Sequence, residues 1–130
     1  MLFFIHMKDR KVLIVEDDEA LRDLYSTILA SADIQVLSTR VGEEGVQMAF
    51  EQHPDVIMMD VMLPDISGHD AVKRIRLDEW GKNATVIFLT NRSDAESVVN
   101  AVQEGGNEYI IKSHVSNKEL LNKVRAAMLA

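Results

Sequence analysis

Short, mostly apolar runs rich in valine and isoleucine alternate with longer stretches of helical periodicity along this chain. The runs lie at residues 11–15, 34–37, 55–59, 86–89 and 108–111. A run of this length, bounded by polar residues, is typical of a strand buried on both faces. Strands that alternate with helices favour a parallel sheet with helices on both sides. The sequence therefore predicts an α/β fold with a doubly wound, five-stranded parallel sheet.

The segments between the strands carry apolar residues at the spacing of one helix face. In the first helix, near residues 18–31, the inward stripe consists of Leu21, Leu24, Tyr25, Ile28 and Leu29. Further helices are expected near residues 42–52, 67–78, 93–104 and 116–128. The expected N-caps are Asp18, Ser67, Ser93 and Ser116. The last two have a glutamate three residues on, which is the spacing of a capping box.

Composition excludes several classes of protein. The chain has 130 residues and a net charge of −7, which disfavours direct binding to nucleic acid or to anionic membranes. Cysteine is absent, so disulfides, thiolate metal sites and cysteine catalysis are excluded. No apolar stretch approaches the roughly 18 residues that span a bilayer. A single domain in the cytoplasm, without membrane contact, is expected.

The first residues stand apart from this pattern. Residues 1–7 form an apolar run that is too short for a secretory signal and lacks a cleavage site of small residues. We assign residues 1–10 to an N-terminal extension or a cloning remnant, and residues 11–130 to the domain.

Acidic residues follow two of the predicted strands. Glu16 and Asp17 come directly after the first strand, and Asp60 comes directly after the third. In an open parallel sheet, ligands bind beyond the carboxyl ends of the strands. Carboxylates gathered there repel one another and lose solvation, so a cation is needed to hold them together. A hard, oxygen-seeking ion such as Mg²⁺ fits this site.

Taken together, these residues resemble the receiver domain of two-component response regulators, the CheY-like superfamily. The resemblance covers about residues 11–128. Its motif residues are Glu16-Asp17, the run from Asp60 through Pro64 to Gly68, Thr90 at the end of the fourth strand, and Tyr109 and Lys112 in and after the fifth. It implies the flavodoxin-like (βα)5 fold with strand order 2-1-3-4-5, in which the first and third strands are neighbours.

The resemblance implies a role for each acidic residue. Asp60 is implied to be the phosphoacceptor of a Mg²⁺-dependent transfer. The metal set is Glu16, Asp17, Asp60 and the backbone carbonyl of Met62, with Asp17 as a direct ligand and Glu16 acting through water. An aspartate oxygen can attack a phosphoryl group to form an acyl phosphate.

The same resemblance implies how the signal leaves the site. Lys112 is expected to contact the phosphoryl group, Thr90 to be the switch hydroxyl and Tyr109 the aromatic residue that follows it. The donor is a histidine kinase or a histidine phosphotransfer protein. The responding face combines the helix near 93–104, the strand at 108–111 and the last helix, and is a candidate homodimer surface. Such domains are signalling switches with at most weak self-dephosphorylation, and are not enzymes.

Two other functions remain open from the residues. A constitutive interaction module, or pseudo-receiver, has the same fold with a vestigial acidic pocket. Against it stands the intact set of Glu16, Asp17, Asp60, Thr90 and Lys112. A hydrolytic metalloenzyme is the other possibility, but no second nucleophile or base supports it. A phosphatase with a second aspartate two residues after the nucleophile is excluded, because that position is Met62.

Overall fold

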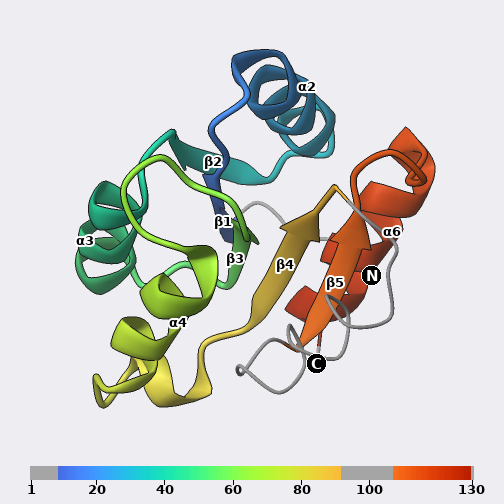
Figure 1. The fold of residues 1–130 in the computed structure, drawn as a ribbon. Helices are drawn as coiled ribbons and strands as arrows, with labels where there is room; N and C mark the ends of the chain where they lie inside the picture. The colour runs from blue at the N-terminus through green and yellow to red at the C-terminus, as the bar shows by residue number, and fades with distance from the viewer. Residues whose placement is uncertain (1–8, 92–106, 130) are drawn as a thin grey trace.

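A parallel five-stranded sheet forms the centre of the computed structural model, which describes residues 9–91 and 107–129 (Figure 1). Its strands are β1 (Lys11–Val15), β2 (Gln35–Thr39), β3 (Val56–Asp60), β4 (Val86–Thr90) and β5 (Glu108–Ile111). They lie in the order β2-β1-β3-β4-β5, and all neighbouring pairs are parallel. The predicted fold class and strand order are confirmed. Because β1 pairs directly with β3, the residues that follow these two strands become neighbours.

Helices cover both faces of the sheet (Figure 1). They are α2 (Glu19–Ala30), α3 (Gly42–Gln52), α4 (Gly68–Arg76) and α6 (Asn117–Met128), with a short 3₁₀ turn η1 (Gly81–Asn83). Helices α2 and α6 pack on the face that contains Val12 and Ile14, whereas α3 and α4 pack on the face of Leu13 and Val15. In the described residues, no helix has the length and apolar character needed to cross a bilayer.

Three of the predicted N-caps begin helices in the structure. Asp18 accepts a hydrogen bond from the backbone N–H of Leu21, and Ser67 accepts one from that of Asp70. Ser116 accepts the N–H of Glu119, as expected for a cap at the start of α6. Each bond satisfies an N–H that the helix itself leaves without a partner. Ser93 and the helix predicted near 93–104 lie outside the described residues.

The structure corrects some details of the sequence prediction. Leu24 does not face inward: it is 42% exposed, and the buried stripe of α2 is centred on Tyr25 and Leu29. Strand β2 starts one residue later than predicted and extends to Thr39, because it is an edge strand whose backbone pairs with β1 while polar side chains stay partly solvated. Strand β3 is also shifted by one residue, so Asp60 is its last residue rather than the first residue after it.

Candidate functional site

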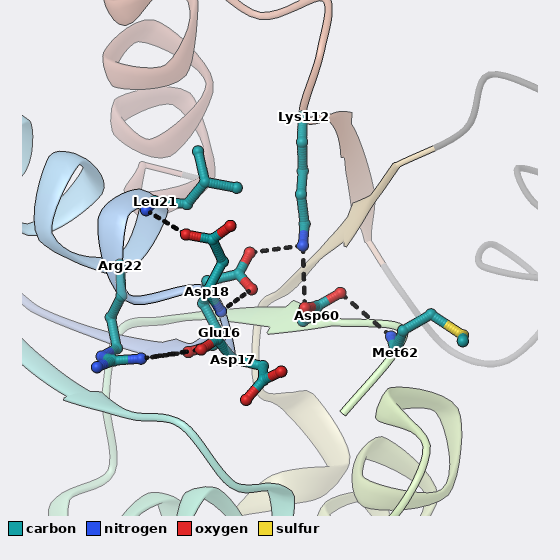
Figure 2. A network of polar contacts seen from close by, with 8 residues as sticks. All are labelled: Glu16, Asp17, Asp18, Leu21, Arg22, Asp60, Met62 and Lys112. Atoms are coloured by element: carbon teal, nitrogen blue, oxygen red, sulfur yellow. Dashed lines mark hydrogen bonds and ion pairs between the residues drawn. The ribbon is translucent and has the colours of Figure 1, made fainter. Parts of the chain in front are cut away.

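The carboxyl ends of β1, β3 and β5 gather Glu16, Asp60 and Lys112 at one edge of the sheet (Figure 2). Glu16 follows β1, Asp60 ends β3, and Lys112 follows β5. Glu16 is 0% exposed and Asp60 is 3% exposed, although both side chains are ionisable. Buried ionisable groups are costly unless they are paired, so the contacts among these three residues determine the properties of the site.

The Lys112 ammonium bridges the two buried carboxylates. Its Nζ lies 2.6 Å from Glu16 Oε1 and 2.9 Å from Asp60 Oδ2. On its other side, Asp60 Oδ1 accepts a hydrogen bond of 3.1 Å from the backbone N–H of Met62. One ammonium therefore faces two carboxylates, and the buried cluster carries an excess of negative charge.

This excess of negative charge changes the ionisation of the site. Burial, followed by the neighbouring Glu16, raises the pKa of Asp60 from 3.8 to about 7. Burial alone would lower the pKa of Lys112, but its bonds to Glu16 and Asp60 raise it above the ordinary value. Lys112 therefore stays charged, while Asp60, with a pKa of about 7, holds a proton part of the time near neutral pH. A second cation in this pocket would displace that proton.

A pocket of about 240 Å³ opens beside the cluster. Its lining residues are Glu16, Asp17, Asp18, Leu21, Asp60, Met62, Asn91 and Lys112. Four of these eight residues carry a carboxylate, and that donor chemistry, with its uncompensated charge, fits a small hard cation. The predicted metal set thus shares one pocket with Lys112.

The acidic side chains of this pocket do not converge on one point. In the described part of the chain, no group of three acidic or histidine side chains is placed to hold a metal. Figure 2 shows the Asp17 carboxylate directed away from Lys112. The Asp18 carboxylate instead caps α2, and the Asp18 N–H donates to Glu16 Oε2 at 3.0 Å. Asp17 therefore lines the same pocket as Glu16 and Asp60, but its carboxylate is not directed towards them.

Thr90 and Tyr109 lie on the strands next to Asp60. Thr90 ends β4, and its carbonyl accepts the backbone N–H of Lys112 at 2.8 Å. This bond fixes the backbone at Lys112 next to the end of β4. Tyr109 is half-buried on β5, opposite Phe88, and packs against the core on the side of α3 and α4. The structure brings Thr90 to the same sheet edge as Asp60 and Lys112, and places Tyr109 further down β5.

Sequence reasoning missed Arg22, which holds the backbone of the acidic turn. Its Nη1 donates to the carbonyl of Glu16 at 2.8 Å and to that of Asp17 at 3.4 Å (Figure 2). Arg22 lies four residues after the cap Asp18, so a long side chain in the first turn can fold back over the preceding loop. That spacing was the available signal in the sequence.

The loop after β3 is closed tightly at Gly68. The Gly68 N–H donates to the carbonyl of Val61 at 2.9 Å. A Cβ at Gly68 would lie 2.1 Å from the Asp60 carbonyl oxygen, so only glycine permits this approach. The glycine of the motif therefore positions the backbone directly beneath Asp60.

Comparison with known proteins agrees with this geometry. The family model described as the response regulator receiver domain matches residues 12–125. The transcriptional regulatory protein AfsQ1 of Streptomyces coelicolor is 34% identical over 117 residues, which cover 90% of this chain and 50% of that protein. The phosphate regulon transcriptional regulatory protein PhoB of Escherichia coli is 30% identical over 92% of this chain and 52% of its own length. The chain thus spans about half the length of these relatives.

Solved structures show the same fold. The chemotaxis response regulator CheY4 of Vibrio cholerae superposes with a TM-score of 0.85 at 26% identity, covering 91% of this chain and 98% of that one. The receiver domain of a sensor histidine kinase from Pseudomonas aeruginosa has a TM-score of 0.86 at 28% identity, covering 93% and 98%. That structure has a magnesium ion coordinated in its active-site cleft. The chain belongs to the response regulator receiver domain family of two-component signalling systems.

Proposed function

We propose that Asp60 accepts a phosphoryl group from a phosphohistidine of a histidine kinase or a histidine phosphotransfer protein. The observation that carries this proposal is a buried carboxylate that lines a pocket and is held between the Lys112 ammonium and the Met62 N–H. A bond forms between an Asp60 oxygen and phosphorus while the phosphorus–nitrogen bond of the donor histidine breaks. Catalysis of such a transfer is mainly alignment and stabilisation of charge, which the Lys112 ammonium supplies.

Mg²⁺ is the cofactor that this donor set fits. The Pseudomonas aeruginosa neighbour, which has the ion in its cleft, supports the assignment. In this chain Asp17, Asp60 and the carbonyl of Met62 would hold the ion, with Glu16 acting through water. The bound ion supplies positive charge against the phosphoryl oxygens. Asp17 is exposed and its carboxylate has no hydrogen bond or ion pair within the described residues, so this side chain is free to turn towards the pocket.

Incubation with Mg²⁺ and a small acyl or amido phosphate tests the phosphoacceptor assignment. The parent protein is expected to gain one phosphoryl group by intact mass, and to gain none when a chelator removes the metal. Asp60→Asn is expected to remain unlabelled, because an amide cannot form the acyl phosphate. A parent that stays unlabelled would favour a constitutive interaction module, and stable labelling of Asp60→Asn would show that another residue is the acceptor.

Mg²⁺ affinity is expected to depend on Asp17 far more than on Asp18. The Asp18 carboxylate is engaged at the N–H of Leu21, whereas the Asp17 carboxylate is available to the pocket. Asp17→Ala is expected to weaken Mg²⁺ binding by about tenfold or more, since a ligand contributes at least as much as an outer-shell residue. Asp18→Ala is expected mainly to lower the stability of α2 by about 1 kcal/mol. Titration calorimetry with Mg²⁺ measures both variants, and equal losses of affinity would refute this ranking.

The signal is proposed to leave through Thr90 and Tyr109. A phosphoryl group at Asp60 adds nearly two negative charges and new oxygen acceptors at this sheet edge. The Thr90 hydroxyl, which lies at the same sheet edge, and Lys112 are then proposed to follow those oxygens, with Tyr109 repacking behind them. The face proposed to respond combines β5 and α6 with the helix predicted near 93–104, which lies outside the described residues, and it is also the proposed homodimer surface. The cytoplasm is the proposed location, where kinase donors are available.

A further inference from the structure

The start of helix α3 has no capping side chain from its own segment. Its N-cap position is Val41, which makes no side-chain hydrogen bond to the helix. The first N–H groups of any helix lack partners within that helix. Helix α3 therefore needs acceptors from elsewhere in the chain, and the structure shows where they come from.

Asp65 supplies both acceptors from the loop that follows Asp60. Its Oδ1 accepts the N–H of Gly42 at 2.8 Å, and its Oδ2 accepts the N–H of Glu43 at 2.8 Å. Burial would raise the pKa of Asp65, but these backbone hydrogen bonds lower it below the ordinary value. The carboxylate thus stays ionised at the positive end of the α3 dipole, and links two segments more than twenty residues apart.

Packing reinforces this link. A Cβ at Gly42 would lie 2.6 Å from Cγ1 of Ile66 and 3.3 Å from Cδ1 of Leu63, so the loop lies directly against the helix start. An ion pair of 2.7 Å between Arg74 and Glu43 joins the start of α3 to α4, the helix that follows the loop. The loop between Asp60 and Gly68 is therefore held at its base by Gly68 and on its outer side by Asp65.

Met62 lies in the loop between Val61, which accepts the Gly68 N–H, and Asp65. Its N–H holds Asp60 Oδ1, and its carbonyl is the proposed backbone ligand of the metal. Met62 is 74% exposed, so its own side chain does little to fix the loop. Whatever fixes the position of this peptide must act through its neighbours in the loop.

We infer that Asp65 is a positioning residue for the phosphoacceptor site, which acts by tethering the Met62 segment to the N-terminus of α3. This inference rests on the proposed function, because it gives Asp65 a part in metal binding and phosphoryl transfer although it touches neither Asp60 nor the pocket. The same carboxylate caps the helix and holds the loop.

Variants of two positions separate the tether from the cap. Asp65→Ala removes both, whereas the double variant Val41→Ser, Asp65→Ala restores a local cap and leaves the loop untethered. Asp70→Ala, which removes an exposed carboxylate from the first turn of α4, is the matched control for charge. Asp65→Asn keeps one acceptor oxygen and is expected to be intermediate.

The measurements are Mg²⁺ affinity, the rate of labelling by a small phosphodonor, and amide exchange at Met62. Asp65→Ala is expected to weaken Mg²⁺ binding about tenfold, the lower end for residues that orient a metal ligand, and to speed exchange at Met62. The double variant is expected to regain thermal stability but not Mg²⁺ affinity. Asp70→Ala is expected to match the parent.

Recovery of Mg²⁺ affinity in the double variant would overturn the inference, because a cap alone would then suffice. So would unchanged exchange at Met62 in Asp65→Ala. The exchange measurement needs no phosphodonor, so it judges the tether even in a protein that takes no phosphoryl group. Failure of the proposed function appears instead as an unlabelled parent whose Met62 exchange still depends on Asp65.

Discussion

Asp60→Asn is expected to make the metal-free domain more stable than the parent at pH 8, by about 2–4 kcal/mol. In the folded protein the pKa of Asp60 is raised from 3.8 to about 7, a difference that corresponds to about 4 kcal/mol. At pH 8 the parent must keep this carboxylate ionised among buried groups, whereas asparagine carries no charge. The substitution that abolishes labelling is thus expected to strengthen the fold.

The advantage of the asparagine variant is expected to shrink as the pH falls. A folded-state pKa above the unfolded value contributes stability that is present below the unfolded pKa and is lost as the pH rises through the folded pKa. Between about pH 7 and pH 4 the folded parent takes up a proton that the unfolded chain does not, so the parent gains stability there. Urea unfolding with a chelator at pH 5 and pH 8 measures this change.

Asp23→Asn, which removes an exposed carboxylate from α2, controls for the loss of one negative charge. A smaller stability for Asp60→Asn than for the parent at pH 8 would show that the Lys112 contact outweighs the cost of burial. Added Mg²⁺ is expected to reverse the order, because only the parent keeps the full set of acidic oxygens.

Lys112→Met is expected to destabilise the metal-free domain by about 3–5 kcal/mol at pH 8, the usual cost of breaking a buried ion pair on one side. The substitution leaves the buried carboxylates of Glu16 and Asp60 facing each other without a cation. Methionine has a similar length, so loss of packing contributes little. The variant is also expected to accept phosphoryl groups slowly, because the ammonium no longer meets the phosphoryl oxygens.

Lys123→Met is the matched control for Lys112→Met. It breaks the exposed pair between Lys123 and Glu108, whose charged atoms are 3.7 Å apart, and is expected to cost less than about 1 kcal/mol. Mg²⁺ is expected to stabilise Lys112→Met more than the parent, because it replaces the missing positive charge. Equal destabilisation by the two substitutions would show that the bridge seen in the structure adds nothing beyond an exposed pair. If Lys112→Met stays unfolded at pH 8, the stabilities of the two variants are compared at pH 5, where Lys112→Met is expected to recover its fold.

Much of the fold could be predicted because local signals and buried strands agree. The strands β3 and β4 are buried at every position. Their sequences are therefore nearly unbroken apolar runs, which differ clearly from the alternation of apolar and polar residues in a half-exposed strand. Side-chain caps such as Ser67 and Ser116 act within four residues of themselves, and sequence spacing is sufficient to find them. The meeting of Glu16 and Asp60 also needed the strand order, which the resemblance to receiver domains implied, because that order decides which strand ends are neighbours.

Predictions failed where the partner of a residue is distant in the sequence. The role of Asp65 depends on a helix more than twenty residues earlier, and only the lack of a cap at Val41 signalled it. Leu24 was placed inward because the apolar stripe is wider than the surface that the sheet offers to α2. The direction of the Asp17 carboxylate is a rotamer, which no spacing encodes.

The bridge made by Lys112 also has a consequence for the order in which the chain is made. Asp60 precedes Lys112 by 52 residues, and Glu16 comes earlier still. A nascent chain that has left the ribosome as far as β4 carries both acidic residues without the ammonium that neutralises them. Closing the pocket at that stage would bury two like charges together. Co-translational folding of this domain is therefore expected to finish only after β5 and residue 112 have emerged.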